Sequence, residues 1–271
     1  RRLSILDVSR AGLQPFVDAS KKVTVMGNGE IYNYKELREK LIQLGHKFSS
    51  HSDFEVVLHG YLEWGEKLPL YLRGMFSCAI YDSRMNKLFL FRDRLGIKPL
   101  YYAFKDSTLF FASEVTALIK TPEVDTYVTA EGINKYLLYG YVPQTIEFMK
   151  GIHSVDPGEI LTFDLERIKK QKYWKIPKQE EKKIPLNDLI KTTRSHLEDS
   201  IKVHLQSDVP LGVFLSGGID SCSVTGLASK VLGKKVSTFS IGFSDGPLHL
   251  NETSTARQVS EYYNTDHHEY I

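Results

Sequence analysis

A short glycine-rich segment in the second half of the chain has the residue types and spacing best suited to binding an anion. It covers residues 216–221, reads SGGIDS, and stands between an apolar run at 213–215 and a helix-like stretch. Gly217 and Gly218 have no Cβ, so their amide N–H groups can approach a phosphate closely. The positive end of the following helix would point at the same place. Asp220 would be repelled by phosphate unless a cation lay between them, so the segment predicts a phosphate site with Mg²⁺.

Two other interpretations of this segment have to be weighed. It is not a Walker A loop, because the pattern GxxxxGK[ST] and its lysine are missing. A tight Gly-Gly turn with Ser216 and Asp220 as helix caps would need no ligand. The segment follows a strand and precedes a helix, which is where parallel sheets bind ligands, and this position favours binding over the purely structural role.

The segment resembles the SGGxDS pyrophosphate loop of ATP pyrophosphatases, enzymes that split ATP into AMP and pyrophosphate while adenylating a carbonyl oxygen. The resemblance implies that ATP is bound by residues in and around the loop, namely Phe214, Leu215, Ser216, Gly217, Gly218, Asp220, Ser221 and Ile241. It also implies that Asp220 binds Mg²⁺. For Ile241, which lies in the next apolar run, packing of the side chain in the core is an equally good interpretation.

The elements around the loop alternate between strand-like and helix-like patterns. Strands are expected at 213–215, 236–243 and 267–271, and helices at 187–205, after the loop, and at 252–264. Asn187 is the expected cap of the first of these helices, and Gly233 is expected to end the second. Strand, helix, strand, helix, strand at this spacing predicts parallel strands with right-handed crossovers. Three strands do not complete a doubly wound sheet, so more chain is expected after Ile271.

Two pairs of residues could suggest further chemistry. His267 and His268 would point to opposite faces of a strand, so they cannot share a metal ion without a bend, and packing with hydrogen bonding is the preferred interpretation. Cys78 and Cys222 have no base nearby in the sequence to activate them. Both are therefore expected to be buried small residues rather than nucleophiles.

Residues 1–168 have the pattern of an α+β domain with much antiparallel sheet. Asn28-Gly29 predicts a turn after the apolar run at 23–26. Asn33 and Ser52 each stand three residues before a Glu, which predicts that they are N-caps of two helices. Further strands are expected at 75–81, 88–91, 100–104, 109–112 and 159–163.

A series of short motifs in this part is specific for one family. It consists of RLSILD at 2–7, QP at 14–15, NGEIYN at 28–33, SD at 52–53, GMF at 74–76, RDRLGIKPLY at 92–101 and ASE at 112–114. The series resembles the class II glutamine amidotransferase domain of glutamine-hydrolysing asparagine synthetases. The pyrophosphate loop follows in that family's order, so the resemblance covers essentially the whole chain. It implies an Ntn-hydrolase-like glutaminase domain of sandwiched antiparallel sheets, truncated at its N-terminus, and then the start of an α/β parallel-sheet ATP-pyrophosphatase domain at 187–271.

The resemblance also implies a glutamine pocket. Arg2 would hold the α-carboxylate as a bidentate fork, Asp53 would pair with the α-ammonium, and Glu30 would line the pocket. The side chain of Asn28 and the N–H of Gly29 would form the oxyanion hole, whose donors must be in place before the charge develops. Main-chain contacts would come from Leu3, Ser4, Ile5 and Leu6. Taken singly, Asn28-Gly29 could be a hairpin turn, Asp53 a helix cap and Arg2 a surface charge.

The sequence departs from the family's pattern in three respects. The family's nucleophile is a Cys at the mature N-terminus whose own α-amine acts as base, and this sequence begins at Arg1 without it. The C-terminal half of the synthetase domain is also absent. Asn251-Glu252 stands where the family often has an acidic pair, which puts a metal role for Asn251 in doubt. The expectation is an internal fragment of a longer enzyme, inactive as a glutaminase by itself.

The function that the resemblance implies for that enzyme is asparagine synthesis. Aspartate would be adenylated by ATP and amidated with ammonia from glutamine, giving asparagine, glutamate, AMP and pyrophosphate. A related amidotransferase or β-lactam-synthetase-like enzyme with another carboxylate acceptor is one alternative, and a non-catalytic nucleotide-binding module is another. The expected partners are the small molecules glutamine, aspartate and ATP, with no nucleic acid and no membrane, and a homodimer is the assembly considered.

Composition and charge narrow the classes of protein further. The chain has 271 residues, enough for about two domains, and its 42% apolar and 25% charged residues exclude disordered, collagen-like and coiled-coil chains. A net charge of +2 gives no argument for a nucleic-acid partner. Two cysteines cannot build a disulfide scaffold, which favours a reducing cytosol. The lysine-rich stretch at 169–186 is expected to be a solvated linker rather than a phosphate-binding patch.

Overall fold

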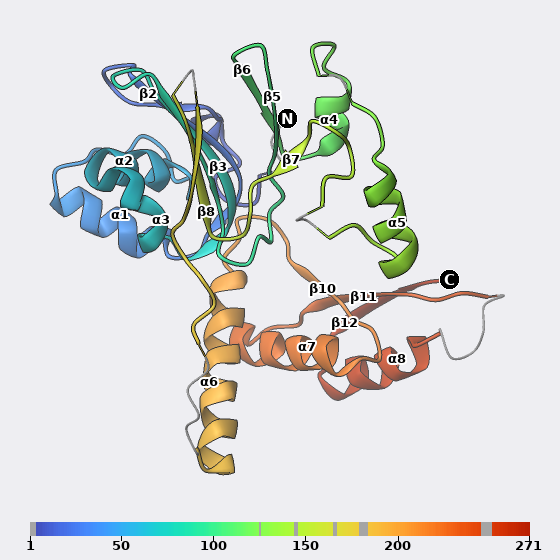
Figure 1. Cartoon of the computed structure of the whole chain (residues 1–271). Coiled ribbons are helices and arrows are strands. Elements are labelled where there is room, and N and C mark those ends of the chain that lie inside the picture. The colour runs from blue at the N-terminus through green and yellow to red at the C-terminus, as the bar shows by residue number, and fades with distance from the viewer. Residues whose placement is uncertain (1–3, 125, 144–145, 165–166, 179–183, 245–250) are drawn as a thin grey trace. The chain divides into compact units, whose positions relative to one another are not determined.

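The chain folds into two compact units, Arg1–Lys178 and Gln179–Ile271. The computed structural model describes residues 4–124, 126–143, 146–164, 167–178, 184–244 and 251–271 (Figure 1). The strands of the first unit pair antiparallel, whereas those of the second pair parallel.

Two sheets form the centre of the first unit. The larger has six strands in the order β1-β2-β3-β4-β8-β9, namely β1 (Phe16–Val17), β2 (Val23–Ile31), β3 (Gly74–Asp82), β4 (Lys87–Arg92), β8 (Glu159–Phe163) and β9 (Ile168–Lys172). The smaller has three strands in the order β6-β5-β7, namely β6 (Thr108–Ala112), β5 (Tyr101–Lys105) and β7 (His153–Ser154). The strands expected from the sequence in this unit are therefore all present.

The first unit is layered, with helices on the outer side of both sheets. Its helices are α1 (Tyr34–Gln43), α2 (Glu55–Trp64), α3 (Leu68–Tyr71), α4 (Val115–Ile119) and α5 (Ala130–Tyr139), with short 3₁₀ turns at Arg10–Gly12 and Gly65–Lys67. Successive strand residues point to opposite faces, so Phe89 joins the core under α1 and α2 while Leu90 joins the core between the sheets. Leu118 of α4 packs in a third core on the far side of the smaller sheet. This confirms the expected α+β fold with sandwiched antiparallel sheets.

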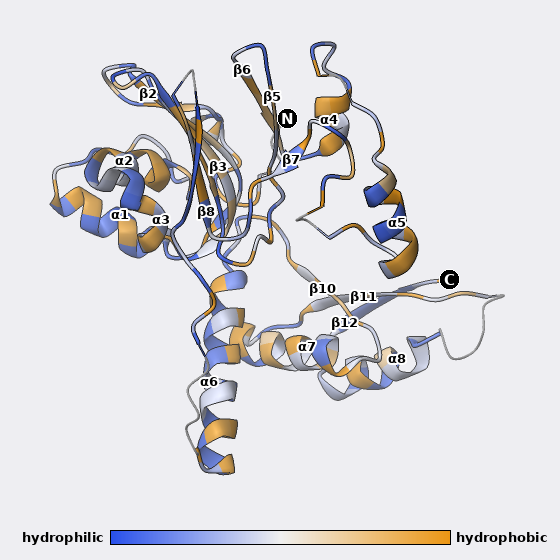
Figure 2. Ribbon diagram, in the orientation of Figure 1, coloured by the Kyte–Doolittle hydropathy of each residue, from blue (hydrophilic) through white to orange (hydrophobic). Residues whose placement is uncertain are grey.

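Helix α1 is amphipathic, with hydrophobic and hydrophilic residues alternating along it (Figure 2). Leu37 and Leu41, one turn apart, are the buried residues of α1. The lysines and glutamates on the other face of α1 are exposed to solvent. The helix is therefore held against the sheet by burial of this narrow apolar stripe.

The turn predicted at Asn28-Gly29 is wrong, because β2 continues through both residues. Gly29 has φ +139°, and a Cβ there would lie 2.0 Å from the carbonyl oxygen of Met75 on β3. The glycine is needed because the neighbouring strand approaches closely, which is the other common reason for a glycine inside a strand. Asn28 consequently lies in the sheet, directly opposite Ser77.

Of the two helix caps predicted in the first unit, Asn33 stands at the predicted position without forming the capping bond, and Ser52 is wrong. The Asn33 side chain makes no capping bond to α1; its Nδ2 donates to the Tyr71 carbonyl and its Oδ1 accepts from the Arg73 N–H, both at 2.9 Å. It therefore ties the start of α1 to the chain after α3. Phe54 precedes α2, and the Ser52 hydroxyl accepts from the N–H of Phe54 at 3.3 Å without capping the helix.

Part of the stretch expected to be a linker is a strand. β9 (Ile168–Lys172) pairs with β8 and closes one edge of the larger sheet. The strand was not predicted because its sequence is rich in lysine. Two of the lysines make contacts in the structure: Lys172 Nζ lies 3.1 Å from Asp156 Oδ2, and Lys170 Nζ lies 5.4 Å from the Tyr102 ring centre. Lysine is a common residue on exposed edge strands.

The second unit has the predicted alternation of strands and helices. Its elements are α6 (Leu186–His204), β10 (Gly212–Phe214), α7 (Ile219–Leu232), β11 (Ser237–Ile241), α8 (Thr253–Tyr262) and β12 (Asp266–Tyr270), with the three strands parallel in the order β10-β11-β12. Gly233 ends α7 in the left-handed conformation, as expected. Asn187 does not cap α6, because the helix already begins at Leu186 after Pro185. Of the helices described in either unit, none is both long and apolar enough to cross a membrane.

Candidate active sites

A pocket of about 660 Å³ in the first unit gathers most of the residues expected to bind glutamine. Its walls come from both sheets and from the loops that follow β4 and β6. Six of the expected residues line it, namely Ile5, Leu6, Asn28, Gly29, Glu30 and Asp53. Ser4 is described but does not line the pocket, and Arg2 and Leu3 lie outside the described residues.

Two carboxylates give the pocket its negative character. Asp53 is buried, and its Oδ2 accepts a hydrogen bond from the N–H of Ile31 at 2.8 Å. Burial raises the pKa of Glu30, the nearby Asp53 carboxylate raises it further, and Lys98 acts in the opposite direction. Buried carboxylates close together favour a cation between or beside them, so this part of the pocket suits an ammonium group.

Lys98 is a pocket residue to which the sequence analysis assigned no role. Its loop is held by the buried carboxylate of Asp93, which accepts from the N–H groups of Leu95, Ile97 and Lys98 at 3.0–3.1 Å. The buried guanidinium of Arg92 donates to the carbonyl of Lys98 at 2.8 Å. The motif at 92–101 could have indicated this loop. A charged pair, Arg92-Asp93, stands before a glycine-containing segment, and such side chains can hydrogen-bond to the main chain of the loop.

Three more residues of the pocket were missed as site residues. Gln14 Oε1 accepts from the N–H of Gly27 at 2.6 Å and so holds β2 beside the chain that precedes it. Ser77 and Cys78 line the pocket from β3, and a strand register that places β3 beside Asn28 could not be read from the sequence. Cys78 is 1% exposed, and burial raises the pKa of its thiol, which makes it a poor nucleophile as expected.

The second candidate site is the SGGIDS loop, which joins the end of β10 to the start of α7. The Ser216 and Ser221 hydroxyls lie 2.8 Å apart, and the N–H of Ser216 donates to Ser221 Oγ at 3.1 Å. The N–H of Gly218 donates to Ser216 Oγ at 3.2 Å, and that of Gly217 donates to Glu252 Oε2 at 3.3 Å. Both glycine amides thus donate to side chains, and one of them already binds an anionic oxygen.

The three apolar residues expected to contact a nucleotide differ in exposure: Leu215 is buried, whereas Phe214 and Ile241 are exposed. Leu215 is 2% exposed, and its N–H donates to the Phe239 carbonyl at 2.8 Å, so its side chain is not available to a ligand. Phe214 is 78% and Ile241 63% exposed, at the carboxyl ends of β10 and β11. Core packing of Ile241 is therefore wrong for this structure, and both side chains are available to a ligand at the edge where parallel sheets bind one.

The acidic residues near this loop do not form a ready-made metal cluster. Asp220 is exposed in the first turn of α7, and no group of three His, Cys, Asp or Glu that could hold a metal is present among the described residues. Asn251 Oδ1 accepts from the Thr253 hydroxyl at 2.8 Å at the start of α8. His267 Nδ1 lies 2.9 Å from the Thr238 hydroxyl, which agrees with the hydrogen-bonding role expected for it.

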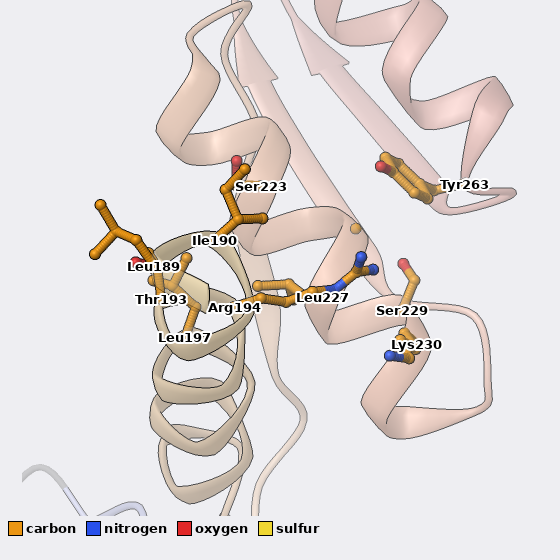
Figure 3. Close-up of a pocket in the computed structure, with 11 residues that line it drawn as sticks. Leu189, Ile190, Thr193, Arg194, Leu197, Ser223, Leu227, Ser229, Lys230 and Tyr263 are labelled. Atoms are coloured by element: carbon orange, nitrogen blue, oxygen red, sulfur yellow. The ribbon is translucent and has the colours of Figure 1, made fainter. Parts of the chain in front are cut away.

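A separate apolar cavity of about 680 Å³ lies between α6 and α7 (Figure 3). Leu189, Ile190 and Leu197 of α6 face Leu227 of α7 across it, and Tyr263 lies at its far side. None of the residues 216–221 lines this cavity. It is a hydrophobic groove between helices, distinct from the loop.

The two units correspond to two families of domain. The glutamine amidotransferase domain model matches residues 1–174, and the asparagine synthase model matches residues 192–271. The chain therefore joins a glutamine amidotransferase domain to part of an asparagine synthase domain. The chain belongs to the glutamine amidotransferase domain family, and its second unit matches the asparagine synthase model.

Three relatives illustrate this membership. Asparagine synthetase [glutamine-hydrolyzing] 3 of Bacillus subtilis is 32% identical over 100% of this chain and 46% of its own length, and asparagine synthetase [glutamine-hydrolyzing] 2 of the same organism is 41% identical over 85% and 32%. Amidase chry2 of Gibberella zeae is 30% identical over 98% of this chain and 41% of its own length. The chain spans about half the length of the first of these relatives, or less in the other two.

Proposed function

We propose that this chain carries the glutamine-binding part and the ATP-binding part of an enzyme that makes asparagine from aspartate, glutamine and ATP. The observation that carries the proposal is the convergence of Asn28, Gly29, Glu30 and Asp53 on one pocket, in a chain whose second unit presents the SGGIDS loop. The first unit matches the glutamine amidotransferase domain model, and the second matches the asparagine synthase model.

In the first unit, the pocket would bind glutamine by both ends. The ammonium group would lie beside Asp53 and Glu30, while Arg2, outside the described residues, would hold the α-carboxylate. Asn28 and the N–H of Gly29 would donate to the amide oxygen as it gains negative charge during attack by a nucleophile. That nucleophile is an N-terminal Cys in this family, and the buried Cys78 does not replace it. Glutamate and ammonia would be the products.

In the second unit, the β-carboxylate of aspartate would attack the α-phosphorus of ATP and pyrophosphate would leave. The amides of Gly217 and Gly218, with the hydroxyls of Ser216 and Ser221, would donate to the oxygens of the departing pyrophosphate. Ammonia would then displace AMP from β-aspartyl-AMP to give asparagine. Phe214 and Ile241, both exposed beside the loop, would contact the nucleotide.

The residues present fit Mg²⁺ as an ion that arrives with the nucleotide. Asp220 offers one carboxylate at the loop, and Mg²⁺ usually takes one or two carboxylates together with phosphate oxygens and water. Bound there, Mg²⁺ would neutralise charge on the leaving pyrophosphate. Asp220 would orient it, and the contact between Gly217 and Glu252 shows that a carboxylate oxygen can reach the amides that would hold phosphate.

The test is an assay of the intact gene product for pyrophosphate release with ATP, Mg²⁺, glutamine or ammonia, and a panel of carboxylic acids. Asparagine formation with aspartate is the expected result. Asp220→Ala should lower it at least 100-fold with either nitrogen source, whereas Arg2→Ala should lower only the reaction with glutamine. ATP binding without pyrophosphate release would contradict the proposal and favour a nucleotide-binding module.

A second candidate keeps the two sites but changes the acceptor. The relative named amidase chry2 is similar over nearly the whole chain, which allows a different carboxylate to be the substrate of this scaffold. Pyrophosphate release with another acid of the panel, and none with aspartate, would favour this alternative.

The proposed location is the cytoplasm. The two cysteines, Cys78 and Cys222, are both free thiols, and thiols stay reduced in that compartment.

A further inference from the structure

Ser77 is a buried polar residue of the pocket for which the structure offers no hydrogen-bond partner. Its side chain is 97% buried on β3, and it lines the pocket of the first unit. Among the residues described, none makes a hydrogen bond with its hydroxyl. Ser77 Oγ is not among the described side-chain atoms that are fully buried without a partner, so the hydroxyl reaches the open space of the pocket that Ser77 lines.

The strand register shows which way the hydroxyl points. Phe76 and Cys78, its neighbours along β3, belong to the core under the helices, whereas Ala79 belongs to the core between the sheets. Ser77 therefore projects toward the space between the sheets. Its direct neighbours across the sheet are Asn28 on β2 and Arg92 on β4, and opposite residues of an antiparallel pair share a face.

These two neighbours leave the hydroxyl to the ligand. Arg92 has donors only, and its guanidinium already donates to the carbonyls of Lys98, Gly96 and Val155 at 2.7–2.9 Å. Asn28 is the residue whose side chain would donate to the amide oxygen of bound glutamine. Since opposite residues of a strand pair have Cβ atoms about 5 Å apart, a group held by Asn28 lies within reach of the Ser77 hydroxyl.

We propose that Ser77 is a further specificity-determining residue of the glutamine site, whose hydroxyl hydrogen-bonds the side-chain carboxamide of the bound amino acid beside Asn28. The inference rests on the proposed function of the first unit and adds a contact to it. The Ser77 hydroxyl can donate to the carboxamide oxygen or accept from its NH₂ group, so in both cases it recognises the amide end of the ligand. An amino acid that lacks the amide loses this contact.

The test compares Ser77→Ala with the wild-type intact gene product, using glutamine and norvaline, which has the same chain without the amide. Calorimetric titration gives the affinities, with glutamine hydrolysis followed in parallel. Ser77→Ala should weaken glutamine binding about 3- to 10-fold, the effect of one hydrogen bond, and leave norvaline binding within twofold. Ser83→Ala, the same change at an exposed position just after β3 and outside the pocket, is the control and should change neither affinity.

A measurement without ligand separates function from structure. Removing a hydroxyl that bonds to no other side chain or main-chain group should leave the melting temperature nearly unchanged, so Ser77→Ala should fold. A lowered melting temperature, or equal weakening of glutamine and norvaline, would mean that Ser77 supports the fold and would overturn the proposal. Unchanged glutamine affinity would overturn it too, while the proposed function would stand. A wild-type protein that binds no glutamine would contradict the proposed function itself.

Discussion

The two candidate sites hold their polar groups in opposite ways. In the first unit, Glu30, Asp53 and Asp93 are buried and fixed by strands and by main-chain hydrogen bonds. In the second unit, Asp220 and Glu252 are exposed, and the loop amides donate to side chains that can move away. A buried pocket has to be complete before its ligand arrives, because water cannot rearrange around its charges. An exposed loop can exchange one anionic partner for another.

The largest effect expected from this difference is at Gly29. In Gly29→Ala the new Cβ would lie 2.0 Å from the Met75 carbonyl at φ +139°, so β2 and β3 would have to separate. We expect a loss of about 3 to 5 kcal/mol in the free energy of unfolding of the first unit, measured by denaturant titration. Gly140→Ala is the control, because its φ of +73° is similarly unfavourable but a Cβ there meets no atom within 4 Å. Equal losses for the two variants would show that strand contact at Gly29 is unimportant.

A smaller effect is expected at Glu55, a buried carboxylate that holds the chain just before Asp53. It accepts from the N–H groups of Ser49 and Ser50 at 2.7 and 2.8 Å. Burial alone would raise the pKa of Glu55, but the His59 ring 3.7 Å away and the hydrogen bonds from Ser50 and Ser49 lower it from 4.5 to about 2. A carboxylate with a lowered pKa stabilises the fold above pH 4.5, and this contribution is lost as the pH falls through about 2.

Glu55→Gln should therefore destabilise the first unit by about 3 kcal/mol at pH 7, and this difference from the wild type should shrink as the pH falls from 4.5 to about 2. Unfolding measured as a function of pH checks this. Glu63→Gln, on the same helix but partly exposed beside His46, should change stability by less than about 1 kcal/mol. A difference between wild type and Glu55→Gln that does not shrink in acid would contradict the assigned cause.

The smallest effect is expected at Glu252, in the exposed second site. Glu252→Gln removes a negative charge that competes for the Gly217 amide, so the KM for ATP should fall about two- to threefold, as befits an exposed interaction. Glu261→Gln, near the other end of α8, is the control and should leave the KM unchanged. A higher KM would show that Glu252 helps to bind the nucleotide, and the second site would then resemble the first.

Sequence reasoning succeeded where local pattern and tertiary contact agree. The alternation of strands and helices in the second unit, and the glycine that ends α7, follow from periodicity and from backbone freedom at Gly233. The pocket residues Glu30 and Asp53 came together as expected, because their motifs belong to one family of domain. Their individual roles remain predictions.

Prediction from the sequence failed where a residue's conformation depends on a contact with a residue far away in the sequence. Asn28-Gly29 has the local signature of a turn, but its conformation is set by Met75, which lies on another strand. Asn33 has the signature of a cap, yet its amide bonds to the chain after α3. Ser77 carries no local signal at all, because its position beside Asn28 is a matter of strand register.

The border strands of the larger sheet have a consequence for how the protein behaves at high concentration. β1 is only two residues long, and β9 carries three exposed lysines, Lys169 on one face and Lys170 and Lys172 on the other. Repulsion between these lysines and those of a second copy disfavours pairing of the two β9 strands at the sheet edge. Chemical acetylation that neutralises these ammonium groups would remove the repulsion, and the folded protein would then be prone to edge-to-edge aggregation.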